Sequence, residues 1–289
     1  MEEDKATLPG TLLLTIIQRH LKPEPFQWLK EKGKLIRKET TATALSASFA
    51  AVPRKTGRLI IEVSANELHQ IDQRYNGLTV TNWPLDKLCR LWLLLQVDAA
   101  DESLYHNHIE SLFRHAEMNE LSALYAALPV FAYPETWQFR TTEGIRSNIG
   151  TVLESIMYEN PYPYQYLDEP SWNQLVLKAF FTDKDINRIM GLDKRSNKAL
   201  SLILIDYAHE RQAAHRMVNP LLWRLVSKFI DKDSIKDIEK LFDDAHVTVR
   251  RAAVLACYHS DYEPAKHLLE KEPLMLEAVK ANQLNWNSL

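Results

Sequence analysis

Residues 243–256 run Asp243-Asp244-Ala245-His246-Val247-Thr248-Val249-Arg250-Arg251-Ala252-Ala253-Val254-Leu255-Ala256. Two acidic residues precede a run whose apolar side chains recur at helical spacing, which predicts a turn followed by an amphipathic helix. Comparable short helices are expected around this stretch, at about 233–243, 262–271 and 273–282. The last third of the chain is therefore predicted to consist of packed helical hairpins.

The same stretch resembles the signature of HEAT-type repeats, in which an Asp of the turn pairs with an Arg of a neighbouring second helix and small residues let helices approach. Stacked repeats need several units to bury a continuous core, and few units are recognisable here. We expect an all-α fold, arranged as an α–α superhelix of stacked helical hairpins that is HEAT-like in the C-terminal third.

Glycine is scarce, with 7 residues in 289. Phosphate-binding loops, nucleotide turns and β folds with many hairpins use glycine for backbone conformations with positive φ. The composition therefore argues against a dinucleotide-binding fold, a P-loop enzyme and a β sandwich. It favours helices joined by short turns, in agreement with the helical periodicity of most of the chain.

Several local structures are predicted between the first helices and the middle of the chain. Residues 54–57 form a basic turn, 59–63 has strand character, and Ser64 begins a helix with a capping box. Residues 134–158 are expected to form one long helix. Residues 160–166 contain two prolines, which bias their predecessors towards extended geometry, so this segment is expected to be non-helical.

Charge and cysteine content exclude several classes of protein. Lys and Arg number 35 against 38 Asp and Glu, a formal net charge of −3, so the basic excess of a nucleic-acid-binding protein is absent. Two cysteines, Cys89 and Cys257, are too few for a disulfide framework or a zinc knuckle. No apolar run reaches the roughly 18 residues of a membrane span, and no secretory signal is recognised. We expect a cytoplasmic protein without a membrane span, with no cofactor and no metal site.

The domain organisation is predicted from the absence of a linker. No stretch rich in Gly, Ser or Pro separates two domains. We expect a single all-helical domain over residues 1–289, with a looser N-terminal helical part over 1–118 and a core over 119–289 that includes the C-terminal hairpins.

The most informative polar residues end an apolar helix. Residues 199–208, Ala-Leu-Ser-Leu-Ile-Leu-Ile-Asp-Tyr-Ala, carry apolar side chains on every side, which predicts a helix buried all round. Asp206 and Glu210 are i and i+4 and share a face, with His209 beside them. Unpaired carboxylates would cost several kcal/mol to bury. A structural ion-pair network, a polar ligand pocket and a metal site are the three alternatives.

Other residues also have both structural and functional interpretations. Lys178 is a snorkelling lysine or part of a pocket. Arg146, Gly150 and Glu154 share one helix face, either as a surface salt-bridge stripe or as a place where a ligand packs against the glycine. Trp172, Trp223 and the tyrosines of the Asn-Pro-Tyr-Pro segment belong to the core or to a pocket wall. The sequence has no Walker A motif, no Gly-x-Ser-x-Gly elbow and no HExxH motif, so it gives no strong catalytic signal.

Six blocks of residues follow one another between about Asn119 and Leu269. They are Asn119-Glu120-Leu121 with Leu124-Tyr125 and Leu128-Pro129; Glu143-Gly144-Ile145-Arg146-Ser147-Asn148-Ile149; Asn160-Pro161-Tyr162-Pro163; Trp172-Asn173-Gln174-Leu175-Val176-Leu177-Lys178-Ala179; Gly191-Leu192-Asp193-Lys194-Arg195-Ser196-Asn197; and Asp206-Tyr207-Ala208-His209-Glu210-Arg211 with Arg216 and Leu222-Trp223-Arg224. In these blocks the chain resembles the EboA family. The N-terminal third matches more loosely, through Pro53-Arg54 and Leu91 to Leu95.

The resemblance implies an accessory role in a metabolite pathway. The family is named for a gene cluster that also encodes a UbiA-like membrane prenyltransferase, a TatD-like metal hydrolase and sugar-isomerase-like and dehydroquinate-synthase-like enzymes. The cluster is associated with making or exporting a small metabolite, including movement of a pigment precursor across the inner membrane. We expect a soluble helical accessory protein of the ebo pathway that binds a ligand or a partner. Other ebo-cluster proteins, the UbiA-like prenyltransferase among them, are the expected partners, and nucleic acid is not.

The family blocks coincide with the polar cluster and define a candidate ligand pocket. Its residues are Arg146, Asn148, Glu154, Asn160, Trp172, Asn173, Lys178, Asp206, His209, Glu210 and Arg216. The alternative function is an enzyme that acts on a small anionic metabolite, with His209, Asp206 and Glu210 as acid–base residues. Whether the chain is an enzyme is left open by the sequence.

Overall fold

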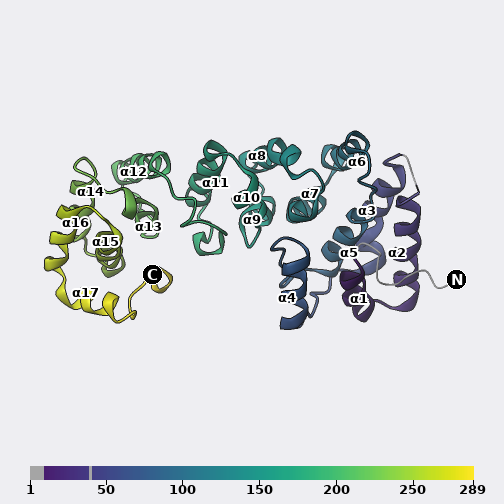
Figure 1. Cartoon of the computed structure of the whole chain (residues 1–289), viewed down its shortest axis with the longest axis horizontal. Helices are drawn as coiled ribbons and strands as arrows, with labels where there is room; N and C mark the ends of the chain where they lie inside the picture. The colour runs from purple at the N-terminus through teal and green to yellow at the C-terminus, as the bar shows by residue number, and fades with distance from the viewer. Residues whose placement is uncertain (1–9, 39–40) are drawn as a thin grey trace. The chain divides into compact units, whose positions relative to one another are not determined.

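The structure, a computed structural model, describes residues 10–38 and 41–289 (Figure 1). Their regular elements are α-helices and short 3-10 helices, and these residues form no strand. The predicted all-α fold is confirmed. Within these two ranges, none of the helices has the length and apolar character that a membrane crossing would require.

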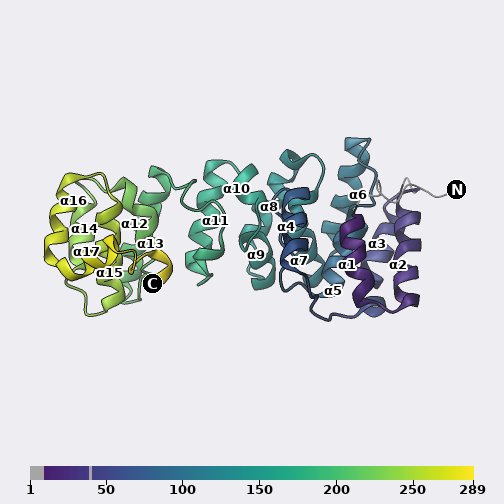
Figure 2. The same cartoon turned by 60° about the horizontal axis from the view of Figure 1, so that its bottom comes forward.

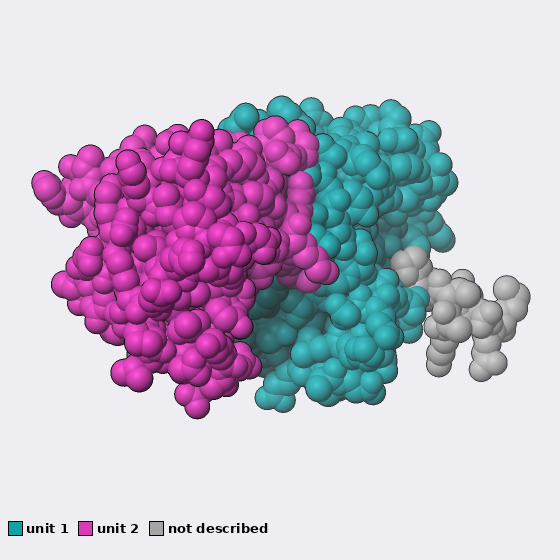
Figure 3. Space-filling view, turned by 60° about the vertical axis from the view of Figure 1, so that its left-hand side comes forward, with its two compact units in different colours: residues 1–167 teal, residues 168–289 magenta. Residues whose placement is uncertain are grey.

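The chain divides into two compact units, residues 1–167 and 168–289, which Figure 3 colours separately. Unit 1 contains α1 Thr11–His20, α2 Pro23–Ile36, α3 Thr43–Thr56, α4 Ala65–Arg74, α5 Leu85–Leu94, α6 Glu102–His115, α7 Met118–Ala126, α8 Gln138–Arg146, α9 Gly150–Met157 and α10 Tyr162–Tyr166. Unit 2 contains α11 Glu169–Phe181, α12 Lys198–Ala213, α13 Leu222–Val226, α14 Ile235–Leu241, α15 Val247–His259, α16 Glu263–Leu268 and α17 Pro273–Lys280. The expectation of a single domain over 1–289 with a 1–118 part and a 119–289 core stays a prediction.

Helix α5 lies in the core of unit 1. It packs against α1, α2, α3 and α7 (Figures 1 and 2), and nine of its ten residues are buried. Gly33 of α2 faces the ring of Trp92 on α5, and a Cβ at Gly33 would overlap that ring. Only glycine therefore permits the close approach of these two helices.

Helix α15 has the corresponding position in unit 2, where it packs against α13, α14, α16 and α17. Its buried side is made of small and medium residues, among them three alanines, which keep the neighbouring helices close. Arg250 Nη1 donates hydrogen bonds to the main-chain oxygens of Asp244 (2.7 Å) and Ala245 (3.3 Å). The contact between this Arg and the acidic turn therefore uses the main chain of Asp244. The superhelix and its HEAT-like character stay predictions.

The expected long helix over 134–158 is wrong, because the chain breaks it into a 3-10 turn, α8 and α9. Ser147 and Ile149 are extended, and the Ser147 hydroxyl accepts a hydrogen bond from the main-chain N–H of Ile149 (3.1 Å). A serine side chain that bonds the nearby backbone competes with the helical ladder. Gly150 is therefore the first residue of α9, where its helix-weakening effect is small.

Three further local predictions differ from the structure. Residues 54–56, expected in a basic turn, are the last residues of α3. Residues 160–166 contain the short helix α10, with Pro163 in its first turn. Proline is tolerated there because main-chain N–H groups in the first turn of a helix make no hydrogen bond within the helix. The segment 59–63 is extended but forms a single antiparallel bridge, Ile60 with Pro84. The capping box at Ser64 is confirmed.

Candidate functional site

The eleven predicted pocket residues fall into both units. Unit 1 holds Arg146, Asn148, Glu154 and Asn160; unit 2 holds Trp172, Asn173, Lys178, Asp206, His209, Glu210 and Arg216. Within each unit the structure shows which of these side chains meet and what each one contacts.

Helix α12 is buried on one side only, so the prediction that it is buried all round is wrong. Leu202 and Ile203 are 50% and 37% exposed. Solvent-facing aliphatic residues are common on protein surfaces, which is why apolar content alone overstated the burial of this helix. The buried residues form one stripe, Leu200, Ser201, Leu204, Ile205 and Ala208.

Asp206, His209 and Glu210 are exposed on α12. His209 Nε2 lies 3.1 Å from Asp237 Oδ2 on α14, and the His209 side chain is 49% exposed. Solvent screens charges in such positions, so the two carboxylates need no buried cation or metal between them. The acid–base hypothesis predicted a concave cavity that holds these side chains, and none of the three lines the cavity or the groove described below.

Asn173 and Trp172 have structural roles at the start of α12. Asn197 Nδ2 donates to Asn173 Oδ1 (2.8 Å) and Asn173 Nδ2 donates to Asn197 Oδ1 (3.2 Å). Asn197 Oδ1 also accepts from the main-chain N–H of Leu200 (2.8 Å) and so caps the helix. Trp172 is fully buried, with the Arg195 guanidinium 4.9 Å from its ring centroid. The family block around these residues therefore fixes how α11 and α12 meet.

The remaining predicted residues of unit 2 and three of those in unit 1 lie at or near the surface. Arg216 is exposed beyond the end of α12, and Lys178 is partly buried on α11 with polar contacts of its own. Arg146 and Asn148 are exposed around the end of α8, and Glu154 is partly buried on α9.

Asn160 is a buried structural clamp in unit 1. Its Nδ2 donates to the main-chain oxygens of Ser155 (2.8 Å) and Tyr125 (3.0 Å), and its Oδ1 accepts from the main-chain N–H of Tyr162 (3.0 Å). Both amide donors and one acceptor position are satisfied by the backbone. Asn160 thus ties α7, α9 and α10 together.

A lysine–serine cluster that sequence reasoning missed lies beside this clamp. Lys87 Nζ of α5 donates to Ser155 Oγ of α9 (3.3 Å), and Ser155 Oγ lies 2.7 Å from Ser122 Oγ of α7. The Lys87 ammonium also stands 4.6 Å from the ring centroid of Trp83. Burial lowers the pKa of Lys87 to about 8, while the Asp86 and Glu154 carboxylates oppose this shift.

A cavity of about 510 Å³ opens in unit 1 where the end of α2, the segment after α5, α6 and the segment after α7 meet. Most of its lining is aliphatic, with a few polar groups among them, which is the usual composition of a small-molecule site. Arg37 donates a hydrogen bond to Gln96, and Tyr105 accepts one from the Ala132 N–H (3.2 Å). The lining residues are Arg37, Leu94, Leu95, Gln96, Val97, Asp98, Ala99, Tyr105, Val130 and Ala132.

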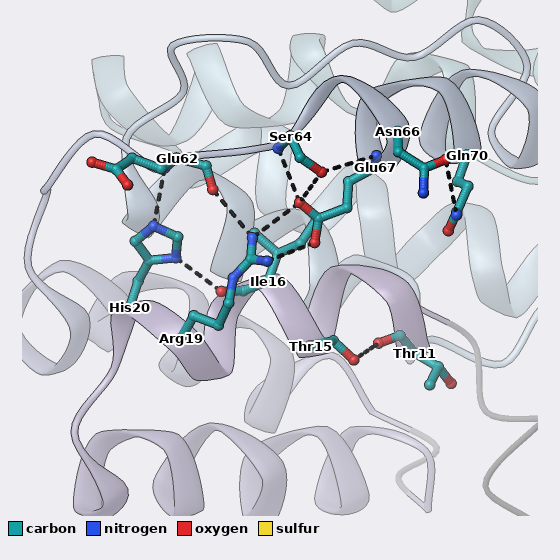
Figure 4. A network of polar contacts seen from close by, with 10 residues as sticks. All are labelled: Thr11, Thr15, Ile16, Arg19, His20, Glu62, Ser64, Asn66, Glu67 and Gln70. Atoms are coloured by element: carbon teal, nitrogen blue, oxygen red, sulfur yellow. Dashed lines mark hydrogen bonds and ion pairs between the residues drawn. The ribbon is translucent and has the colours of Figure 1, made fainter.

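A second, more polar groove of about 680 Å³ lies between the end of α1 and the start of α4. Figure 4 shows its network: the Arg19 guanidinium donates to both carboxylate oxygens of Glu67 (2.8 and 3.1 Å), and Glu67 closes the capping box with Ser64. His20 accepts a hydrogen bond at Nε2 from the main-chain N–H of Glu62 (3.0 Å).

Neither of these sites was predicted, because each joins segments far apart in the sequence. The sequence did contain one usable signal, since Arg37 and Asp98 flank the apolar ends of two helices that line the cavity. Nothing local to either residue indicates that the two helix ends meet.

The comparisons with known proteins agree with the blocks identified in the sequence. The family model described as "Metabolite traffic protein EboA" matches residues 10–227, which include the cavity, the groove, the lysine–serine cluster and helix α12. None of the curated proteins and none of the solved structures matches the chain significantly. With a family match over most of its length, the chain belongs to the EboA family of metabolite traffic proteins.

Proposed function

We propose that the chain is a cytoplasmic helical accessory protein of the ebo pathway, which supports the synthesis or export of a small metabolite by binding it. A prenylated compound or a pigment precursor is the expected metabolite class. The observation that carries this proposal is the cavity of about 510 Å³ in unit 1. Its volume suits a small molecule, and it lies within the residues that match the family.

The chemistry of the lining supports an amphiphilic ligand. Leu94, Val97 and Val130 offer an aliphatic wall for a prenyl or aromatic portion. Arg37 at the end of α2 places a guanidinium beside this wall, and a guanidinium favours a carboxylate, a phosphate or a phenolate oxygen. A ligand with one apolar and one acidic end uses both features.

Partner binding belongs to the same proposal. The exposed side of α12 combines Leu202 and Ile203 with the acids Asp206 and Glu210, all in the segment where the family blocks are dense. We propose this side, with the exposed Arg216, as a contact surface for another ebo-cluster protein such as the UbiA-like prenyltransferase. The predicted pocket residues on α12 then act as interface residues.

Ligand binding is tested with 1-anilinonaphthalene-8-sulfonate, an apolar anion whose fluorescence rises in apolar sites. Ala99 lines the cavity, and Ala100 beside it is exposed outside the lining. We expect Ala99→Phe to fill the cavity and weaken dye binding at least tenfold, and Ala100→Phe to leave it unchanged. Native mass spectrometry of the protein from cells that carry the whole gene cluster is expected to show a bound small molecule that Ala99→Phe removes.

Two results would contradict the proposal. Equal dye binding by the wild-type protein and Ala99→Phe would place the dye elsewhere. A protein from such cells that carries no small molecule, in a preparation whose fold is verified by circular dichroism, would leave the cavity without a cellular ligand.

A further inference from the structure

The end of α3 and the segment after it combine exposed cations with exposed aliphatic residues. Residues 54–60, called the basic segment below, read Arg54-Lys55-Thr56-Gly57-Arg58-Leu59-Ile60. Arg54, Lys55 and Arg58 are exposed, and Leu59 and Ile60 are 66% and 52% exposed. Scattered exposed aliphatic residues are ordinary, but here two of them follow three exposed cations directly in the sequence, and the segment, called the patch below, is amphipathic in composition.

The backbone holds this patch outward. The main-chain N–H of Leu85 donates to the oxygen of Leu59 (2.8 Å), and the N–H of Ile61 donates to the oxygen of Trp83 (3.0 Å). On the other edge, Arg19 Nη2 donates to the oxygen of Glu62 (3.2 Å) (Figure 4). With both edges fixed, the Leu59 and Ile60 side chains remain exposed instead of folding into the core.

The charges around the patch favour an anionic partner. No acidic residue occurs between Arg54 and Ile61. Arg58 Nε lies 3.5 Å from Asp86 Oδ2, but its side chain is still 58% exposed. Leu59 and Ile60 also line the polar groove, in which Glu67 is paired with Arg19. Glu62 lines the same groove and is an exposed acid.

We propose that the basic segment docks the protein on the surface of a bilayer that contains anionic lipids. Its cations contact the lipid headgroups, and Leu59 and Ile60 enter the boundary between headgroups and acyl chains. Basic side chains beside a few apolar ones are the combination that binds peripheral proteins to such surfaces, because neither attraction suffices alone. The docking is independent of the cavity of the proposed function, so either can fail without the other.

Vesicle co-sedimentation of the full chain tests this docking. We expect binding to phosphatidylcholine vesicles with about a quarter phosphatidylglycerol, weak binding to phosphatidylcholine alone, and loss of binding as salt screens the charges. Each cation near an anionic surface contributes roughly a fivefold gain in partition. The double variant Arg54→Gln/Lys55→Gln should therefore bind roughly 25-fold more weakly, and Leu59→Ser/Ile60→Ser should lose most binding at every salt concentration.

Matched control variants distinguish binding by the basic segment from general effects of losing a positive charge or an exposed aliphatic side chain. Lys22→Gln/Lys34→Gln removes two exposed cations elsewhere in unit 1, and Leu274→Ser removes an aliphatic residue that is 84% exposed in unit 2. Both are expected to bind vesicles as the wild-type protein does. Equal binding to both kinds of vesicle, or equal losses in the controls, would overturn the proposal. So would a concentration-dependent dimer that Leu59→Ser/Ile60→Ser abolishes in a protein that binds no vesicles, since this would assign the patch to self-association.

Discussion

Helices α5 and α12 have similar apolar sequences and each carries two charged residues four positions apart, yet only α5 is buried on nearly all sides. In α5 the pair is Asp86 and Arg90, which form an ion pair of 2.9 Å with both side chains at most 5% exposed. In α12 the pair is Asp206 and Glu210, both acidic and both exposed. Opposite charges at this spacing can be buried together, whereas like charges at the same spacing stay where water screens them.

The buried pair in α5 also has further partners. Arg90 Nε donates to the main-chain oxygen of Phe49 (3.2 Å), and its guanidinium lies 5.2 Å from the Phe49 ring centroid. Glu120 of α7 lies 3.8 Å from the same guanidinium. These contacts show what a charged group needs in order to be buried, and the described surroundings of Asp206 and Glu210 contain no comparable ion pair.

The largest expected effect comes from removing one partner of the buried pair. Arg90→Met leaves the Asp86 carboxylate buried with only the 3.5 Å contact to Arg58, and breaking a buried pair in this way costs about 3–5 kcal/mol. The control Arg216→Met removes an exposed cation that follows α12 and should change stability by less than about 0.5 kcal/mol. Urea denaturation of both variants measures the free energies, and equal effects would contradict the comparison.

Truncating a leucine in each helix is expected to give a somewhat smaller difference. Leu93 on α5 is fully buried and Leu202 on α12 is 50% exposed. Leu93→Ala should destabilise the protein by about 2–5 kcal/mol, and Leu202→Ala by less than about 1 kcal/mol. Thermal denaturation followed by circular dichroism compares the two, and a cost for Leu202→Ala as large as that for Leu93→Ala would mean that α12 is buried after all.

Lys87 on α5 is expected to make stability depend on pH above neutrality. Burial lowers its folded-state pKa from 10.5 to about 8, so between these values the unfolded chain binds more protons than the folded one. The free energy of unfolding therefore rises as the pH increases from about 8 to 10.5. Below about pH 8 Lys87 is charged in the folded protein, and the full cost of burying that charge lowers the stability. The stability of the wild-type protein relative to Lys87→Met should improve between about pH 7 and about pH 10, as measured by urea denaturation. A difference that is constant over this range would mean that Lys87 is solvated.

The smallest effect is expected at the exposed acids. Glu210→Gln removes a like-charge pair at i and i+4, which should stabilise the protein by about 0.2–0.5 kcal/mol at low salt and less at high salt. If the two carboxylates were buried without a partner, the same substitution would remove a burial penalty and stabilise the protein by several kcal/mol. Urea denaturation at two salt concentrations distinguishes these cases.

The features that were predicted correctly from the sequence depend on residues that are close together in the chain. Scarce glycine and helical periodicity gave the all-α class, and the Ser64 capping box is set by a residue three positions further on. The break between α8 and α9 was missed because a single Ser147 hydrogen bond to the backbone outweighs the apolar periodicity on both sides.

The candidate sites are formed by contacts between residues far apart in the sequence, which no local sequence pattern reveals. The reciprocal pair of Asn173 and Asn197 joins residues 24 positions apart, and the cavity joins Arg37 to Ala132. The family blocks did locate residues with defined roles, such as Asn160 and Asn173. They could not show that these amides bond the backbone or each other, since hydrogen-bond partners are set by packing in three dimensions.

Carboxyl footprinting of the native protein tests the contrast between α5 and α12 most directly. Carbodiimide coupling to glycine ethyl ester, read by mass spectrometry, reports the solvent access of Asp86, Asp206 and Glu210 in one sample. We expect rapid modification of Asp206 and Glu210, and protection of Asp86 until the protein is unfolded in urea. Protection of Asp206 and Glu210 as strong as that of Asp86 would contradict the surface position of α12.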